Sequence, residues 1–301
     1  MQPRSLKDWA LLLALVAMWG SAFMFNKLGV ATVPPATLVA GRLLIGALIL
    51  LVVVHALGAR LPPLGRNWLP YLVLALVGNC IPFYVIVWGQ KTVDSALAGI
   101  LMAAMPLVTL VLAHFFVQGE RMTRKRAAGF ALGFLGIVLL IGPAALTGIG
   151  GSALQVVSQL AVLTGALCYA ANSVLTRLMV KENNVLIAST AMLLVATVVM
   201  LPVAFILDRP WTLAPSFSST AAIVWLGIGP TAVATLCYFK LIGSAGPTFM
   251  SLVNYLSPPV AVFLGVTLMG EHPGVEAYTG LALILAGIAL SQLRHRTPSA
   301  S

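Results

Sequence analysis

Charged side chains are scarce in this sequence. Only 8% of the 301 residues are charged, whereas 60% are hydrophobic, and the mean hydropathy is +1.03. A soluble globular domain usually has about a quarter of its residues charged. No polar linker separates the apolar runs, which follow one another along almost the whole chain. The composition excludes an ordinary soluble domain and predicts an all-α protein embedded in lipid.

Acidic residues are scarcer still. The chain has 7 Asp and Glu against 17 Lys and Arg, and every acidic residue falls at or beyond the end of an apolar run. Proton-coupled carriers usually place a carboxylate or a histidine inside the membrane. Only His55 and His114 lie within apolar runs, near their ends. If the chain is a carrier, this pattern favours facilitated or weakly coupled transport.

Cysteine clusters and common functional motifs are also missing. The 3 cysteines are isolated, with no CxxC spacing, so we expect no disulfide framework, metal site or cofactor. No GxxxxGK[ST] motif is present, which argues against an ATP-driven pump within this chain, and no HExxH or GxSxG motif supports a membrane-embedded enzyme. The net charge of +10 is spread over short segments, which argues against a nucleic-acid partner.

The sequence has instead ten apolar runs of membrane-spanning length. A bilayer core of about 30 Å requires roughly 20 mostly apolar residues per helix. The predicted spans are residues 9–30, 34–57, 68–90, 96–117, 125–142, 156–180, 185–207, 219–242, 247–269 and 275–293. The first run is long and lacks an A-x-A cleavage site before Asn26, so we expect it to be a span and not a signal peptide.

The basic residues predict the orientation of these spans. With the N-terminus in the cytoplasm, most of the 17 basic residues fall in cytoplasmic segments. Only Lys27, Lys91 and Arg209 fall on the opposite side, and Arg42 lies within a span. Because cytoplasmic loops carry an excess of Lys and Arg, we predict that both termini are cytoplasmic.

The two halves of the chain resemble each other. A glutamate followed by two glycines recurs with identical spacing in the second half. These residues are Glu120, Gly129 and Gly136 in residues 1–150, and Glu271, Gly280 and Gly287 in residues 151–301. Each half would contain five helices, and an odd number places the second copy in the opposite orientation. The sequence therefore predicts two inverted five-helix repeats.

Inverted repeats are a common construction of secondary transporters, in which two similar halves expose a central site to either side in turn. A membrane sensor or structural protein remains the alternative from another class, and an importer the alternative within transport. For an exporter and for an importer alike, the expected partners are a small-molecule substrate and the lipid bilayer.

Several segments are similar to one known family. They are Trp19-Gly20-Ser21 with Phe23, Arg42-Leu43-Leu44, and the paired stretches from Pro106 to Glu120 and from Pro258 to Glu271. They resemble the drug/metabolite transporter superfamily, specifically the bacterial EamA-type proteins. The resemblance implies ten helices, a central cavity between the halves, a location in the bacterial inner membrane, and frequently export of amino acids, related metabolites or toxic organic compounds.

Arg42 is the strongest candidate for a substrate contact. An ionisable group inside a membrane costs about 2.5–3.5 kcal/mol on insertion scales, so its presence needs a reason. The guanidinium would bind a substrate carboxylate or a carbonyl freed by a helix break. The alternative is that the side chain extends along the helix to the outer interface.

Prolines and polar or aromatic residues within the spans complete the candidate site. Proline frees backbone carbonyls, which are tolerated in lipid only where protein or water satisfies them, so we expect the spans containing Pro106 and Pro258 to border the cavity. Interface belts and hydrogen bonds between helices are the alternative roles for the Trp and Asn residues. The candidate cavity residues are Trp19, Asn26, Arg42, Asn79, Tyr84, Trp88, Pro106, Tyr169, Asn172, Tyr238, Asn254, Tyr255 and Pro258.

Small residues predict close helix packing. Gly129 and Gly133 form a GxxxG motif, and Ala282 with Ala286 gives the tenth span a similar step. The packing partner lies either within the chain or in a second subunit, as in a homodimer. Glu120 and Glu271, which precede the fifth and tenth spans, are expected to stabilise the N-termini of those helices.

Overall fold

The structure is a computed structural model that describes residues 5–141, 153–179 and 185–292. The predicted boundary between the halves at residues 150 and 151, the chain termini, and the basic residues Arg4, Lys181, Arg294 and Arg296 lie outside the described residues. Within the described ranges every regular element is helical.

The elements follow the predicted spans closely. The first half contains α1 (Leu6–Val30), α2 (Pro35–Ala56), η1 (Arg66–Trp68), α3 (Leu69–Ala75), η2 (Leu76–Cys80), α4 (Ile81–Gly89), α5 (Ser95–Met102), α6 (Met105–Phe116) and α7 (Arg124–Ile141). The second contains α9 (Ala153–Met179), α10 (Val185–Leu207), η3 (Pro210–Thr212), α11 (Phe217–Leu226), η4 (Gly227–Val233), α12 (Ala234–Met250), α13 (Val253–Met269) and α14 (Val275–Gln292).

Eight helical segments of the described chain are long and apolar enough to cross a membrane. They are Leu6–Val30, Pro35–Ala56, Arg66–Gly89, Ser95–Phe116, Ala153–Met179, Val185–Leu207, Phe217–Gly246 and Val275–Gln292. The predicted fifth and ninth spans correspond to α7, which begins with three basic residues, and to α13, which has 17 residues. These eight predicted spans are confirmed by length and composition, whereas the full number of ten and the inverted orientation stay predictions.

Four of the spans are not simple α-helices. The third and eighth each contain a π-helical segment, η2 and η4, next to Pro82 and Pro230. The fourth span is broken into α5 and α6 at Ala103–Ala104. The predicted ninth span begins within the last residues of α12, which ends at Met250, and is broken at residues 251–252 before α13. Because proline lacks the N–H that closes the helical hydrogen bond, local π geometry and breaks are the expected accommodation. Corresponding spans of the two halves thus carry the same kind of irregularity.

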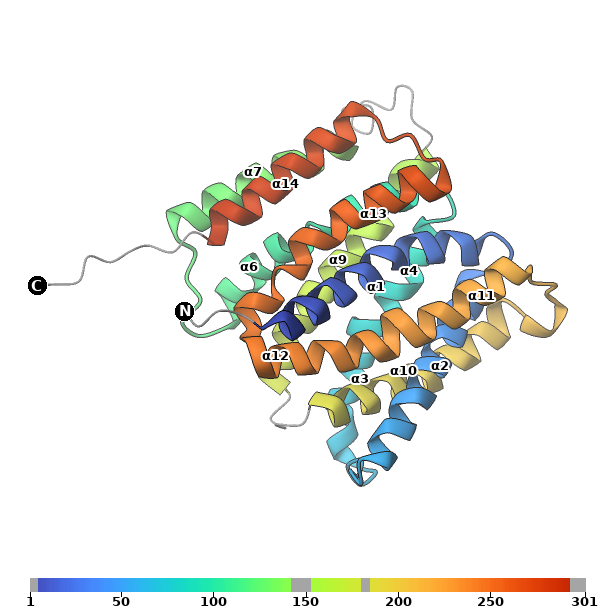
Figure 1. Cartoon of the computed structure of the whole chain (residues 1–301). Helices are drawn as coiled ribbons and strands as arrows, with labels where there is room; N and C mark the ends of the chain where they lie inside the picture. Colours follow the sequence, from blue (N-terminus) through green and yellow to red (C-terminus); the bar gives the residue numbers. More distant parts are fainter. Residues whose placement is uncertain (1–4, 142–152, 180–184, 293–301) are drawn as a thin grey trace, which may run out of the picture.

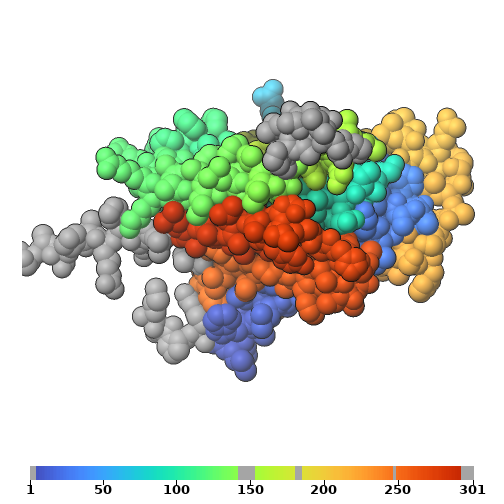
Figure 2. All heavy atoms as spheres, turned by 90° about the horizontal axis from the view of Figure 1, so that it is seen from above, coloured from blue at the N-terminus to red at the C-terminus, as the bar shows by residue number. Residues whose placement is uncertain are grey.

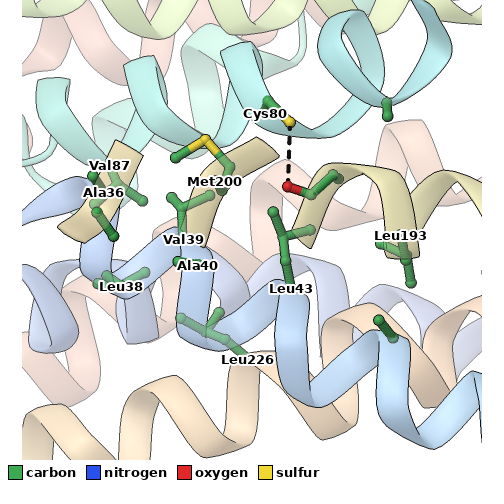
Figure 3. Close-up of a cluster of buried hydrophobic side chains, with 14 of the residues drawn as sticks. Ala36, Leu38, Val39, Ala40, Leu43, Cys80, Val87, Leu193, Met200 and Leu226 are labelled. Carbon is green, nitrogen blue, oxygen red and sulfur yellow. Dashed lines mark hydrogen bonds between the residues drawn. The ribbon is translucent and has the colours of Figure 1, made fainter. Parts of the chain in front are cut away.

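The helices run side by side in one bundle (Figure 1). Helix α1 lies in the middle, in contact with α5, α11, α12 and α13. The largest buried cluster joins α2, α4 and α10 (Figure 3), where the Cys80 thiol donates to the carbonyl of Ala196 at 3.7 Å. This cluster holds elements of both halves together on one side of α1.

Helices α7 and α14 form a pair at one edge of the bundle (Figures 1 and 2). A Cβ on Gly136 would lie 2.8 Å from the carbonyl oxygen of Gly280, and a Cβ on Gly287 would lie 2.7 Å from the backbone nitrogen of Gly133. The backbones approach so closely that only glycine fits. The predicted GxxxG partner is therefore found within the chain, and a homodimer stays a prediction without support from this motif.

The predicted small-residue step of the tenth span does not mediate packing within the described chain, and its packing against a second subunit stays a prediction. Ala282 and Ala286 are exposed on the outer face of α14, whereas Gly280 and Gly287 face α7. The alanines have the four-residue spacing of the motif, but the face of α14 that meets α7 is set by the seven-residue glycine spacing. Spacing alone did not reveal which face of the helix packs.

Gly287→Val should disrupt this helix pair. The new side chain would collide with the backbone of Gly129 and Gly133, and overpacking of this kind costs about 1–3 kcal/mol or more. We expect a lower thermal unfolding midpoint and a lower yield of monodisperse protein in detergent. Ala286→Val, one residue earlier on the exposed face of α14, is the matched control and should behave as wild type. Equal effects of both substitutions would contradict this packing.

Glu271 stabilises a different helix from the one predicted. Its two carboxylate oxygens accept hydrogen bonds from the backbone N–H of Ser95 (2.7 Å), the Ser95 hydroxyl (2.7 Å) and the backbone N–H of Ala96 (2.8 Å), at the N-terminus of α5. Glu120, its counterpart in the first half, forms ion pairs with Arg126 (3.0 Å) and Arg177 (3.7 Å). The expectation that each glutamate caps the following helix was wrong for Glu271, because the bundle brings the N-terminus of α5 closer to this carboxylate.

Candidate functional site

Arg42 is buried in the interior of the bundle. The residue is 5% exposed, and its guanidinium carbon lies 3.8 Å from the centre of the Phe83 ring. Its Nε donates a hydrogen bond to the Thr231 hydroxyl at 3.1 Å. Within the described residues no carboxylate lies within ion-pair distance, and the terminal nitrogens Nη1 and Nη2 donate no hydrogen bond. The side chain is therefore held inside the bundle, and no residue of the described chain supplies a counter-ion for its charge.

The Thr231 hydroxyl has a second partner that explains its position. It donates to the carbonyl of Leu226 at 2.8 Å, an oxygen whose normal helical donor would be the N–H that Pro230 lacks. Helix α2 approaches η4 closely because Gly46 and Gly227 lie at the contact. A Cβ on Gly46 would lie 2.5 Å from a methyl carbon of Thr231. The proline, the threonine and these glycines together bring η4 against Arg42.

Trp19 contacts the same π-helical segment from α1. Its indole Nε1 donates to the carbonyl of Pro230 at 3.2 Å, and its ring lies 6.1 Å from that of Tyr238 on α12. Trp19 is half-buried, and its indole N–H is directed into the bundle at η4. Because Pro230 and Thr231 are adjacent, η4 brings Trp19 and Arg42 to one place, although they lie on different helices of the first half.

The aromatic contacts continue from Arg42 to α9. The rings of Phe83 and Tyr169 lie 6.2 Å apart in a T-shaped arrangement. One turn further along α9, the Asn172 amide covers Gly78 of η2, where a Cβ would lie 2.6 Å from Asn172 Oδ1. That oxygen is buried and accepts no hydrogen bond from the described residues.

The other predicted residues are more dispersed. Asn26 is buried on α1, and its Oδ1 has no hydrogen-bond partner among the described residues. Tyr84 packs against the α2–α10 cluster, and Tyr255 packs against a second cluster formed by α5, α6, α13 and α14. Asn79, Trp88, Pro106 and Asn254 are half-buried, and Pro258 is buried within α13.

The prolines of the fourth and ninth spans take no part in the Arg42 contacts. Among the described residues the printed contacts of Arg42 lie on α4 and η4, and the aromatic contacts around them add α1, α9 and α12. Helix α13 passes close by, because a Cβ on Gly20 would lie 3.1 Å from the carbonyl oxygen of Ser257. The expectation that Pro106 and Pro258 mark the centre of the site stays untested.

Arg42, Thr231, Trp19, Phe83, Tyr169 and Tyr238 form the central cluster. The cluster combines one buried cation with flat aromatic faces and few hydrogen-bonding groups. Its chemistry suits an anionic group on a small, partly apolar molecule.

A family comparison identifies the class of protein. The model of the EamA-like transporter family matches residues 8–142 and again residues 157–293. The chain belongs to the EamA-like transporter family. The two successive matches cover both halves, so the EamA unit is duplicated in this chain.

Curated relatives of this EamA protein are transporters by name. The "Uncharacterized inner membrane transporter YedA" of Escherichia coli K12 is 29% identical, over 94% of this chain and 89% of YedA. The "Probable terminal-alkyne amino-acid exporter" of Streptantibioticus cattleyicolor is 30% identical, over 95% of this chain and 93% of that protein. A solved crystal structure, 24% identical, matches with a TM-score of 0.65 over 97% of this chain and 99% of its own. The solved structure supports the fold.

Sequence reasoning missed two members of the central cluster of this EamA protein. Phe83 is one of 12 phenylalanines in the chain, and nothing in the sequence distinguishes a ring beside a cation from a ring facing lipid. Thr231 carried a weak signal, because it directly follows Pro230 within an apolar run. A hydroxyl beside a proline that interrupts a helix can satisfy the freed carbonyl, and that pattern marks Thr231.

Proposed function

We propose that this EamA protein is a secondary transporter that exports small carboxylate-bearing metabolites, such as amino acids or related organic compounds, by alternating access. The observation that carries the proposal is the buried Arg42 guanidinium without a counter-ion among the described residues. A charge in a low-dielectric interior is costly unless it is paired. A substrate carboxylate would supply the missing partner each time the site is occupied.

The surroundings of Arg42 support a substrate that also has an apolar part. Phe83 presents its ring to the cation, Tyr169 packs against Phe83, and Trp19 contacts Pro230, which precedes the Thr231 partner of Arg42. A ligand with a carboxylate at one end and an aliphatic or aromatic side chain would use both features. The name of the Streptantibioticus relative, an amino-acid exporter, agrees with this substrate class.

Alternating access is supported by the duplication of the family unit and by the matched irregular spans. We place the protein in the bacterial inner membrane with both termini in the cytoplasm, in agreement with the inner-membrane relative and the positions of the basic residues. Because the described acidic residues lie at helix ends and in loops, we expect transport without obligatory proton coupling.

Counterflow tests the proposal directly. Purified protein is reconstituted into liposomes preloaded with the common amino acids, and an isotope-labelled mixture of the same amino acids is added outside. We expect the liposomes to accumulate at least one labelled amino acid above the level in protein-free liposomes, with no imposed pH gradient. Lack of accumulation of every amino acid would contradict this function. Protection of overexpressing cells against toxic amino-acid analogues would establish export, and increased sensitivity would establish import.

A further inference from the structure

The guanidinium of Arg42 has two edges on which a planar oxyanion can bind through two parallel hydrogen bonds. One edge contains Nε and one terminal nitrogen, and the other contains Nη1 and Nη2. Thr231 accepts the Nε hydrogen at 3.1 Å, and Phe83 covers one face of the group at 3.8 Å. Among the described residues, only the Nη1–Nη2 edge is left without a hydrogen-bond partner.

The Thr231 hydroxyl can contact Arg42 only as an acceptor. A hydroxyl has one proton to donate, and in this structure that proton is directed to the Leu226 carbonyl at 2.8 Å. Pro230 has no N–H to offer that carbonyl. In the π-helical η4, which begins at Gly227, the backbone N–H of Thr231, five residues after Leu226, takes that place, and the Thr231 hydroxyl is a second donor to the same oxygen. The lone pairs of the hydroxyl are then directed at Nε. The interruption of the eighth span by Pro230 thus determines the orientation of an arginine on the second span.

We propose that Thr231 is a positioning residue, which fixes the Arg42 guanidinium so that its Nη1–Nη2 edge binds the substrate carboxylate end-on through two hydrogen bonds. This inference rests on the proposed function and narrows it to substrates with a free, planar carboxylate. An amide or ester of the same molecule can offer only one strong acceptor to that edge, and a primary amide would direct its NH2 group at a donor.

The test compares three substitutions in the eighth span. Thr231→Val keeps the shape of the side chain but removes the hydroxyl, and Thr231→Ser keeps the hydroxyl. Thr235→Val is the matched control, because the Thr235 hydroxyl also donates to a backbone carbonyl, that of Thr231, at 2.6 Å. Thr235 has no hydrogen bond to Arg42, so this control reproduces the loss of a hydroxyl in the same helix.

The measurement is counterflow of the labelled amino acid that the wild-type protein accumulates most, with the unlabelled acid or its amide as competitor. Wild type should prefer the acid over the amide. Thr231→Val should raise the KM for the acid by about tenfold, the effect expected of losing one hydrogen bond to a charged group. Its preference for the acid over the amide should fall by a similar factor. Thr231→Ser and Thr235→Val should stay within about twofold of wild type on both measures.

The acid-to-amide preference distinguishes a positioning role of Thr231 from a role in stability. Partial unfolding of the transporter would reduce binding of the acid and of the amide by the same factor and would leave their ratio unchanged. A wild-type preference retained in Thr231→Val, at unchanged KM, would overturn the inference while leaving the proposed function intact. Equal loss in Thr231→Val and Thr235→Val would also overturn it. Lack of counterflow in the wild-type protein would instead contradict the proposed function, and this inference with it.

Discussion

Arg42→Met should abolish transport of carboxylate substrates while leaving the protein as stable as wild type, or more stable. Methionine retains an apolar chain that can pack against Phe83, but it has no charge. Removing one partner of a desolvated, hydrogen-bonded charge pair costs about 2–5 kcal/mol of binding. We therefore expect counterflow to fall by at least about thirtyfold.

Arg42→Met should not lower the stability of the protein, because Arg42 has no counter-ion among the described residues. In this structure Arg42 has one hydrogen bond and one aromatic contact among the described residues. These do not fully offset the cost of burying a cation. Replacing the cation with an apolar side chain removes that cost, so the thermal unfolding midpoint in detergent should not fall.

Two further variants complete this experiment. Arg42→Lys keeps the charge but loses the planar fork, so it should recover little of the transport. Lys27→Ala is the control for a basic residue at a helix end, because Lys27 already contacts the Val93 carbonyl (3.0 Å) and Asp94 (3.4 Å). Arg42→Met protein that unfolds at lower temperature and still transports the acid would show that Arg42 is structural.

The candidate site was predictable from sequence where a residue type is unusual for its surroundings. Arg42 was found because a cation in an apolar run is expensive, and Trp19 and Tyr169 because amphipathic rings are informative within spans. Thr231 and Phe83 were missed because their roles depend on which helix lies opposite. That information is tertiary, and it follows from glycines such as Gly46 and Gly227 that allow α2 to approach η4.

The fold shows the same division between local and tertiary information. Hydrophobic run length located the spans to within a few residues, because the bilayer sets the length of every helix. The sequence did not indicate that the chain would adopt π geometry in the segment before Pro82 and in the segment that contains Pro230. The sequence did not show which small residues of α14 pack within the chain, because both faces of α14 carry small residues at helical spacing, and only the packed structure distinguishes the two faces.

Glu271→Gln should destabilise the protein more than the corresponding substitution at Glu120. The native carboxylate accepts three hydrogen bonds from Ser95 and Ala96, and these link the second half of the chain to α5 in the first. Glutamine would place an NH2 donor opposite one of those N–H donors. The loss should be about 2 kcal/mol, typical of hydrogen bonds to a charged group, and should lower the unfolding midpoint by about 5 °C.

Glu120→Gln is the matched control for this substitution. Glu120 occupies the corresponding position in the first half, but its partners Arg126 and Arg177 are partly exposed. Ion pairs of that kind contribute about 0–1 kcal/mol. The unfolding midpoint of this variant should therefore stay close to that of wild type. Equal decreases in the two variants would indicate that the position after the fourth and ninth spans, and not the α5 contact, determines stability.

The contact between Glu271 and α5 should also limit access to the predicted outer end of the bundle. Val93, two residues before Ser95, is 2% exposed, so a cysteine introduced there should react slowly with a membrane-impermeant maleimide added outside intact cells. If the Glu271 contact holds the halves together at this end, Glu271→Gln should increase the labelling rate by up to about thirtyfold, the factor that corresponds to the loss of about 2 kcal/mol. Glu120→Gln should not change it. Labelling of Val93→Cys only after the cells are opened would place this end of the bundle in the cytoplasm and would contradict the predicted orientation. The Glu271 contact would then limit access from the cytoplasm and not from outside.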